Sequence, residues 1–467
     1  MSGLKKNDTE KSIKKSSTLN MTEGNILKLI LVYSFPLLLG NLFQNLYNTV
    51  DSLVVGNFIG KTSLAAIGST ASLIHLLVGF FNGFSTGGTI VVSQFFGAKD
   101  NEGIRKTVHT MVATTLIVGI ILSGAGILLS PILLRMMRVP SEVIKEALTY
   151  LTIYFSGIIF LIFYNMATGI LRAVGDSKNP LIFLIISSLL NIVLDITFIV
   201  VFKMGIGGAA IATVISQAVS ALLVFIRLKT STECYRLDWK YIGIDFSILK
   251  KIVRYGFPGA LQMTIFSFSN MFAQRYINIF GADVIAGQAA FQKIDSLALL
   301  PLISLGVGIT TYASQNYGAG KIRRVRVGNE IAMWLSVLIT VVIGVTLAIF
   351  APQLCRLFNN DENVVRYGSF FVRTASCVCM IRSINEVYTG TLNGVGNPKA
   401  PVIIKLSGFV LFRQLWLFVV TRFSDSFFLV GISFAVGWAF GNIVIAIYYY
   451  WYMNKRFGKL EKVKEGE

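Results

Sequence analysis

The most constraining feature of this 467-residue sequence is a series of long apolar segments that follow one another almost without pause. A helix needs about 20 predominantly apolar residues to cross the hydrocarbon core of a bilayer. Charged residues make up only 14% of the sequence, against about 25% in soluble domains. We therefore predict an all-α integral membrane protein with twelve transmembrane helices, near residues 26–55, 64–96, 104–130, 143–171, 180–202, 207–228, 253–279, 284–317, 327–351, 364–393, 400–422 and 428–453.

The basic residues are distributed unevenly over the two sides of the predicted bundle. The net charge is +19, a value that also occurs in nucleic-acid-binding proteins. When the spans are followed in order, 29 Lys and Arg residues fall on the side of the N-terminus and 8 on the opposite side. Such an excess marks the cytoplasmic side. We therefore expect a multi-pass protein of the cell membrane with both termini in the cytoplasm, and no nucleic-acid partner.

Several motifs recur about 221 residues apart, which indicates an internal repeat. Tyr33-Ser-Phe-Pro36 returns as Tyr255-Gly-Phe-Pro258, and Ser93-Gln-Phe-Phe-Gly97 returns as Ser314-Gln-Asn-Tyr-Gly318. Each repeat contains an even number of spans, so both lobes enter the membrane in the same direction, as in transporters with a site between two parallel repeats. Pro36 lies inside the first span, where proline removes a backbone hydrogen bond, so we predict a hinge there.

The repeat divides the chain into two pseudo-symmetric six-helix lobes. The linker between them contains Asp245-Phe-Ser-Ile-Leu-Lys-Lys-Ile, the pattern of a short amphipathic helix at the cytoplasmic surface. The first residues are polar and Lys-rich, without the apolar core of a signal peptide. The predicted order is a disordered cytoplasmic tail (1–25), an amino-terminal lobe (26–228), a cytoplasmic linker (229–252), a carboxy-terminal lobe (253–453) and a second cytoplasmic tail (454–467).

Motifs of enzyme chemistry are weak in this sequence. Gly83-Phe-Ser-Thr-Gly87 matches a nucleophile elbow, but it lies inside a predicted span, where small residues serve helix packing. The stretch from Gly56 to Thr62 has one residue too few between its glycines for a phosphate loop. The 4 Cys and 2 His show no metal-binding spacing. We therefore expect no enzymatic activity, no cofactor and no metal site other than one for Na⁺.

Polar residues inside the spans of the first lobe form three stripes at helical spacing. The stripes consist of Gln44, Tyr47 and Asp51, of Ser188, Asn191 and Asp195, and of Thr213, Gln217 and Ser220. Ionisable residues in a membrane usually face a cavity or a partner, so we expect the stripes to point at one another. Two carboxylates among neutral oxygens suit a proton or Na⁺. The alternative interpretation is a purely structural hydrogen-bond network.

The spans of the second lobe also contain basic residues. Their ionisable residues are Arg275, Lys293, Asp295, Arg373, Arg382, Glu386 and Arg413. Arg382 and Glu386 stand one helical turn apart, and Lys293 is close to Asp295, so ion pairs within the lobe are one interpretation. In the other interpretation, Glu386 faces the central cavity and contacts the substrate.

Together these motifs resemble the multidrug and toxic compound extrusion (MATE) family. The likeness covers about residues 24–455 and rests on the repeat, on Tyr47 with Asp51, and on Asn191-Ile-Val-Leu-Asp195. It implies a V-shaped fold and export of cationic or amphipathic drugs or metabolites, coupled to H⁺ or Na⁺, by alternating access. We expect a functional monomer with small-molecule and lipid partners. A flippase for lipid-linked precursors is the alternative in the same superfamily, and a non-transporting membrane enzyme or scaffold is a third.

The resemblance also implies residue roles. In the DinF-like branch a cation site lies in the first lobe, and the matching positions here are Tyr47, Asp51, Asn191, Asp195 and Thr213, with Asn165 as the nearest match for a further Asn. A Na⁺ ion would be held by Asp51, Asn191, Asp195 and Thr213. The NorM-like branch uses acids in the second lobe where this chain has Phe266 and Arg382, which argues against a site of that type. The candidate residues of the substrate cavity are Gln44, Gln217, Gln262, Gln292 and Glu386.

Overall fold

The computed structural model describes residues 18–137, 139–423 and 427–465. In this part of the chain the protein is helical and has no β-strand, as the sequence predicts. Nine helical segments, and the bent pair α4–α5 as a tenth, are long and apolar enough to cross a membrane. Helices α2 and α8, with 37 and 33 residues, are also long enough to cross a membrane and pack against each other between the lobes, which brings the number of spans in the described chain to the predicted twelve.

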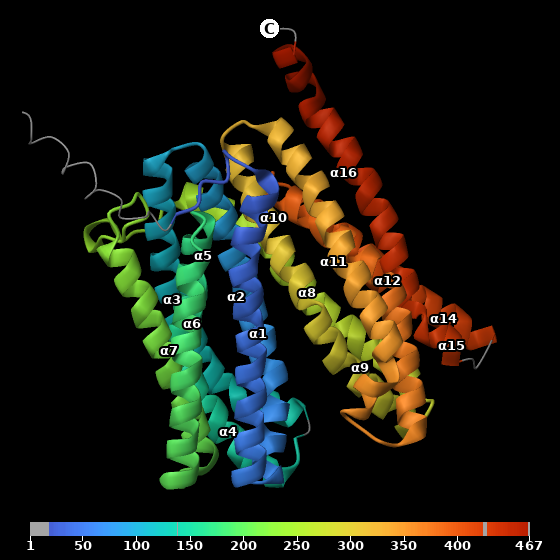
Figure 1. Cartoon of the computed structure of the whole chain (residues 1–467). Helices are drawn as coiled ribbons and strands as arrows, with labels where there is room; N and C mark the ends of the chain where they lie inside the picture. The colour runs from blue at the N-terminus through green and yellow to red at the C-terminus, as the bar shows by residue number, and fades with distance from the viewer. Residues whose placement is uncertain (1–17, 138, 424–426, 466–467) are drawn as a thin grey trace, which may run out of the picture.

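The two halves of the sequence form two separate helical lobes (Figure 1). The first lobe comprises α1 (Ile26–Phe58), α2 (Lys61–Gly97), α3 (Asn101–Met136), α4 (Ser141–Ser156), α5 (Ile158–Ala173), α6 (Lys178–Asp195), the π-helical turn η1 (Ile196–Val201) and α7 (Gly205–Thr230). The second comprises α8 (Phe246–Asn278), α9 (Ala282–Ala298), α10 (Leu300–Gly318), α11 (Ile322–Arg356), α12 (Glu362–Gly394), α13 (Lys399–Leu406), the π-helical turn η3 (Ser407–Phe412), α14 (Arg413–Phe423), α15 (Phe427–Gly431) and α16 (Ser433–Glu465).

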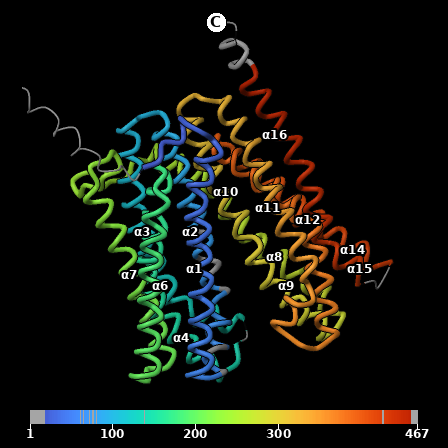
Figure 2. Tube along the Cα trace, viewed as in Figure 1, coloured from blue at the N-terminus to red at the C-terminus, as the bar shows by residue number. Residues whose placement is uncertain are grey.

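The lobes are arranged as a V. They meet at the end that holds both ends of the described chain and diverge toward the opposite end, as the trace in Figure 2 also shows. Close packing of α2 on α8 requires small residues, because a Cβ on Gly83 would lie 2.7 Å from Ala260 and one on Gly256 would lie 2.4 Å from the Gly83 carbonyl oxygen. The predicted fold of two six-helix lobes in a V is therefore confirmed.

Several spans are interrupted within the membrane. Helices α4 and α5 meet at 49° around Gly157. The π-helical turn η1 begins directly after Asp195, and η3 ends directly before Arg413. Such turns often occur at functional sites, so these two breaks draw attention to the charged residue beside each of them. Pro36 lies inside α1, which continues unbroken through it.

The repeated motif Ser-Gln-x-x-Gly forms reciprocal contacts at the closed end of the V. The Gln94 side chain donates to the Gly394 carbonyl at 2.9 Å, and the Gln315 side chain donates to the Ala173 carbonyl at 2.9 Å. A Cβ on Gly97 would lie 1.8 Å from the Gln315 carbonyl oxygen, and one on Gly318 would lie 1.9 Å from that of Gln94. We call these two hydrogen bonds the glutamine clasps. Each clasp joins one lobe to the other.

The segment before α1 is bound at this closed end. The Leu19 amide donates to the Val174 carbonyl in the first lobe, whereas the Met21 amide donates to Oε1 of Gln315 in the second. Met21 is fully buried. Residues 18–25 therefore differ from the disordered tail that we expected for residues 1–25, because both lobes supply their hydrogen-bond partners; residues 1–17 lie outside the described part of the chain.

The linker also differs from the prediction in one respect. Its Asp245-Phe-Ser-Ile-Leu-Lys-Lys-Ile segment does not form a separate helix but begins α8. The Asp245 carboxylate accepts hydrogen bonds from the amides of Ser247 and Ile248, at 2.9 and 3.1 Å. This N-cap stabilises the start of a long helix, so the amphipathic pattern belongs to its first two turns. The only short helix in the described linker is η2 (Trp239–Tyr241).

Candidate functional site

Asp51 and Asp195 lie opposite each other inside the first lobe. Asp51 is on α1, and Asp195 is the last residue of α6 before the π-helical turn. The two helices pack against each other, and each carboxylate lies in the electrostatic field of the other. Asp51 is 9% exposed and Asp195 is fully buried. Two of the predicted site residues, 144 positions apart in the sequence, are thus brought together.

The polar atoms around this pair are largely without hydrogen-bond partners. In the described chain, no hydrogen bond reaches Oδ1 of Asp51, either carboxylate oxygen of Asp195, either side-chain polar atom of Asn191, Oγ1 of Thr213 or Oε1 of Gln217. Most buried polar groups in proteins are paired, and in a membrane an unpaired group costs several kcal/mol. The concentration of such atoms on α1, α6 and α7 therefore indicates a binding site for an ion or another polar ligand.

Tyrosines line the same region. Tyr47 stands one turn before Asp51 and lies near Asp51 and Thr213. Tyr150 and Tyr154 of α4 stack on each other, with ring centroids 6.1 Å apart. Tyr150 lies in the field of Asp51, and Tyr154 lies near Gln217. The sequence analysis missed the α4 tyrosines, although their spacing of four residues in an apolar span was a usable signal.

Four other predicted residues have no described contact with the carboxylate pair. Asn165 lies on α5, and its backbone carbonyl accepts a hydrogen bond from the Ser85 hydroxyl at 3.0 Å. Gln44 is exposed on α1 and Gln262 is half-buried on α8. Gln292 lies in the second lobe, where it lines the pocket described below.

The donor atoms of the first-lobe site restrict its chemistry. It offers carboxylate, amide and hydroxyl oxygens, which are ligands for hard cations, rather than the sulfur and imidazole ligands that suit zinc or copper. Within the described residues there is no group of three or more His, Cys, Asp and Glu residues that could hold a metal ion. Two carboxylates with neutral oxygens can accept a monovalent cation or share a proton.

Arg382 and Glu386 of the second lobe each form an ion pair, but with partners other than those predicted. Arg382 does not pair with Glu386; its two terminal nitrogens contact the Asp295 carboxylate at 2.7 and 3.2 Å. Glu386 accepts instead from Lys405 of α13 at 2.6 Å. Lys293 is exposed, so it does not replace Arg382 beside Asp295. The neighbouring helices α9 and α13 supply partners that a spacing rule within α12 cannot identify.

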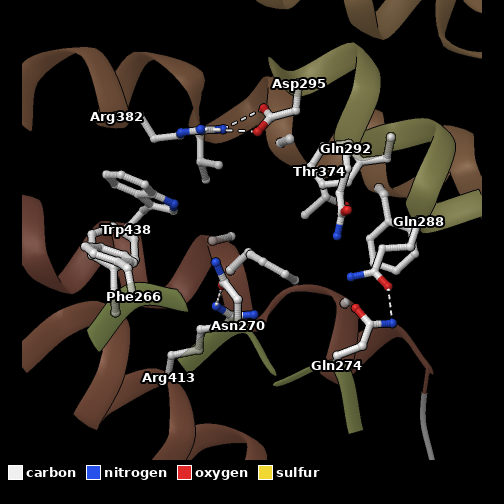
Figure 3. A pocket seen from close by; sticks show the side chains of 18 residues that line it. Phe266, Asn270, Gln274, Gln288, Gln292, Asp295, Thr374, Arg382, Arg413 and Trp438 are labelled. Atoms are coloured by element: carbon white, nitrogen blue, oxygen red, sulfur yellow. Dashed lines mark hydrogen bonds and ion pairs between the residues drawn. The ribbon is translucent and has the colours of Figure 1, made fainter. Parts of the chain in front are cut away.

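The second lobe also contains a pocket of about 460 Å³. Figure 3 shows the Arg382–Asp295 pair on one side of it, with amide side chains and aromatic rings around the rest. Phe266 and Arg382, which stand where the NorM-like branch has acids, both line this pocket. The amides are Asn270, Gln274, Gln288 and Gln292. Their spacing by four residues within α8 and within α9 was a signal that the sequence analysis did not use.

Comparison with known proteins gives the same picture over the whole chain. The MatE family matches residues 36–197 and 258–415, one segment in each lobe. The "Probable multidrug resistance protein YpnP" of Bacillus subtilis is 30% identical over 451 residues, which are 95% of this chain and 98% of the relative. The "Multidrug export protein MepA" of Staphylococcus aureus is 22% identical over 393 residues, 84% of this chain and 87% of the relative.

Solved structures share the fold. A transporter of the MOP superfamily from Pyrococcus furiosus is 24% identical and superposes with a TM-score of 0.87, over 96% of this chain and 99% of that one. A structure described as the outward-facing conformation of a MATE family transporter is 23% identical, with a TM-score of 0.87 over 96% of this chain and 99% of its own. At this level of identity the likeness extends to the fold alone.

Proposed function

Since the chain belongs to the MatE family, we propose that it exports cationic or amphipathic small molecules in exchange for H⁺ or Na⁺. It is a multi-pass membrane transporter of the multidrug efflux type and not an enzyme. The observation that supports cation coupling is the cluster of buried oxygens without hydrogen-bond partners around Asp51 and Asp195. A bound Na⁺ or proton would satisfy them when the ion is present, and the cluster would be destabilised when the ion leaves.

We assign Asp51, Asn191, Asp195 and Thr213 to the coupling ion, with Tyr47 beside it. Asn165 has no described contact with these residues and is not assigned to the ion. The exported molecule and the coupling ion then exchange by alternating access, in which the lobes separate first on one side of the membrane and then on the other. The closed end of the V bears both ends of the described chain. The positive-inside pattern supports placing this end in the cytoplasm, so the V opens outward.

Pro36 is the proposed hinge of α1. It lacks the amide hydrogen that would bind the Val32 carbonyl, and this weakens α1 near the closed end. We expect Pro36→Ala to restore this hydrogen bond and to slow transport while the amount of folded protein stays the same. Size-exclusion chromatography and initial transport rates in proteoliposomes measure the two effects. An unchanged transport rate in this variant contradicts the hinge.

Separate ion gradients test the proposed coupling. Purified protein is reconstituted into liposomes that contain a fluorescent amphipathic dye, and an inward Na⁺ gradient or an inward pH gradient is then imposed alone. We expect one of the two gradients to accelerate dye export and the same dye gradient to drive the reverse ion movement, because exchange couples the two fluxes in both directions. Equal export with neither gradient would contradict cation coupling.

A further inference from the structure

A single buried arginine dominates the charge of the second-lobe pocket. Arg413 begins α14 directly after the π-helical turn η3 and is 3% exposed. Its Nη1 donates to Oδ1 of Asn270 at 2.9 Å, whereas its Nε has no hydrogen-bond partner in the described structure. Burying a guanidinium without an acid is costly, and no described ion pair includes Arg413. No acid of the described chain therefore neutralises its positive charge.

The other charges of the pocket cancel. Arg382 and Asp295 form a two-pronged ion pair whose closest contact is 2.7 Å, and these are the only other ionisable residues in the described lining. Glu386 is neutralised nearby by Lys405. The lining thus has one positive charge in excess, and its one carboxylate is already bound.

The aromatic walls are also arranged in a way that disfavours a cationic ligand. Aromatic faces attract cations, but here the protein's own arginines occupy two of them. The Arg413 guanidinium lies 3.8 Å from the centre of the Phe434 ring, and that of Arg382 lies 5.0 Å from the Trp438 ring. Phe266, Phe291 and Phe371 remain as apolar contact area, and four amides supply hydrogen bonds to polar substituents.

We propose that this pocket binds amphipathic aromatic molecules that carry one anionic group, with the anion against Arg413 and the ring against the phenylalanines. A volume of about 460 Å³ is within the usual range for small-molecule sites, roughly 300–1,000 Å³. The role of this pocket in transport rests on the proposed export function. Within that function, the pocket would select the anionic ones among the amphipathic substrates. Binding itself requires neither an ion gradient nor the first-lobe carboxylates.

Three probes with the same ring system test this proposal: naphthalene-2-sulfonate, 2-naphthylmethylammonium and 2-naphthalenemethanol. Their affinities are measured by equilibrium dialysis against the full chain in a non-ionic detergent, with protein-free micelles as blanks. We expect the sulfonate to bind about tenfold more tightly than either other probe, since a charge-assisted hydrogen bond is worth about 1.5–3 kcal/mol. Octane-1-sulfonate should bind more weakly than naphthalene-2-sulfonate, because it lacks the aromatic ring. Tighter binding of the ammonium probe, or equal binding of the two sulfonates, overturns the proposal.

Two variants connect this binding to Arg413. Arg413→Gln should lower sulfonate affinity by about tenfold and leave the affinity of the neutral alcohol unchanged. Asn270→Asp places an acid beside Arg413 and should lower sulfonate affinity while the buried charge becomes paired, so it remains informative if the first variant does not fold. Arg373→Gln removes an exposed arginine of α12 and should have no effect. Unchanged sulfonate binding in both pocket variants contradicts the proposal.

A further variant separates this proposal from the coupling proposal. Asp195→Asn alters only the first lobe, so it should bind the sulfonate like the unmodified protein even where it no longer transports. Loss of transport with intact binding assigns failure to the coupling site. Normal ion-driven transport together with no preference for the sulfonate contradicts the pocket proposal alone.

Discussion

Asp195→Asn should abolish ion-driven export without lowering stability. The Asp195 carboxylate is fully buried, and no described hydrogen bond reaches either of its oxygens. Asn has nearly the same shape but cannot take up a proton, and it offers a cation only one neutral oxygen. Because a buried charge in a membrane is costly, its removal should leave the melting temperature of the purified protein unchanged or higher. A purely structural carboxylate predicts the opposite pattern of lower stability and retained transport.

The measurement is initial export from proteoliposomes under each ion gradient, together with Tm in detergent. Asp51→Asn should have the same effect, since the two carboxylates form one pair, and Thr213→Ala should lower the rate less because it removes one neutral oxygen. Asp283→Asn is the matched control, since this exposed residue lies in the first turn of α9. Export by Asp195→Asn at the unmodified rate, with the same ion dependence, would show that the pair does not couple.

Asp295→Asn should be strongly destabilising. It leaves the Arg382 guanidinium, which is 10% exposed in its side chain, without its acid. Removing one partner of a buried ion pair costs about 3–5 kcal/mol, whereas replacing both partners is often nearly neutral. We therefore expect a large fall in Tm for Asp295→Asn and a much smaller one for the double variant Asp295→Asn with Arg382→Gln.

Thermal unfolding of the purified variants measures this difference. The exposed pair Arg356–Glu362, 2.8 Å apart with side chains 51% and 78% exposed, provides the control. Glu362→Gln should cost about 1 kcal/mol or less, because solvent screens exposed pairs. If the two second-lobe substitutions instead lower Tm additively, the residues act independently and the ion pair is not the source of stability.

The features that could be predicted from the sequence are those that the apolar interior of a membrane imposes on a chain. Long apolar segments, the excess of basic residues on one side and the 221-residue repeat led to the two helical lobes. Polar stripes at helical spacing led to Asp51 and Asp195, because inside a bilayer such stripes have few places to face. These inferences need only the periodicity of neighbouring residues and the high cost of placing polar groups in the lipid.

The partners of individual charges could not be predicted in the same way. Arg382 binds a residue 87 positions away, because α9 approaches α12 on that side, and a rule for residues four apart on one helix cannot include a third element. The same applies to residues 18–25, whose polar composition suggests disorder. Their order comes from amides and carbonyls of two distant segments that meet only when the lobes have closed.

The glutamine clasps join the two lobes at the closed end through two hydrogen bonds related by the internal repeat. The donor Gln94 is repeated 221 positions later as Gln315, and the acceptor Gly394 corresponds to Ala173, 221 positions earlier, so the two clasps run in opposite directions between the lobes. Separation of the lobes at this end would break both clasps. The internal repeat thus supplies not only the two lobes but also a matched pair of hydrogen bonds that joins them at one end.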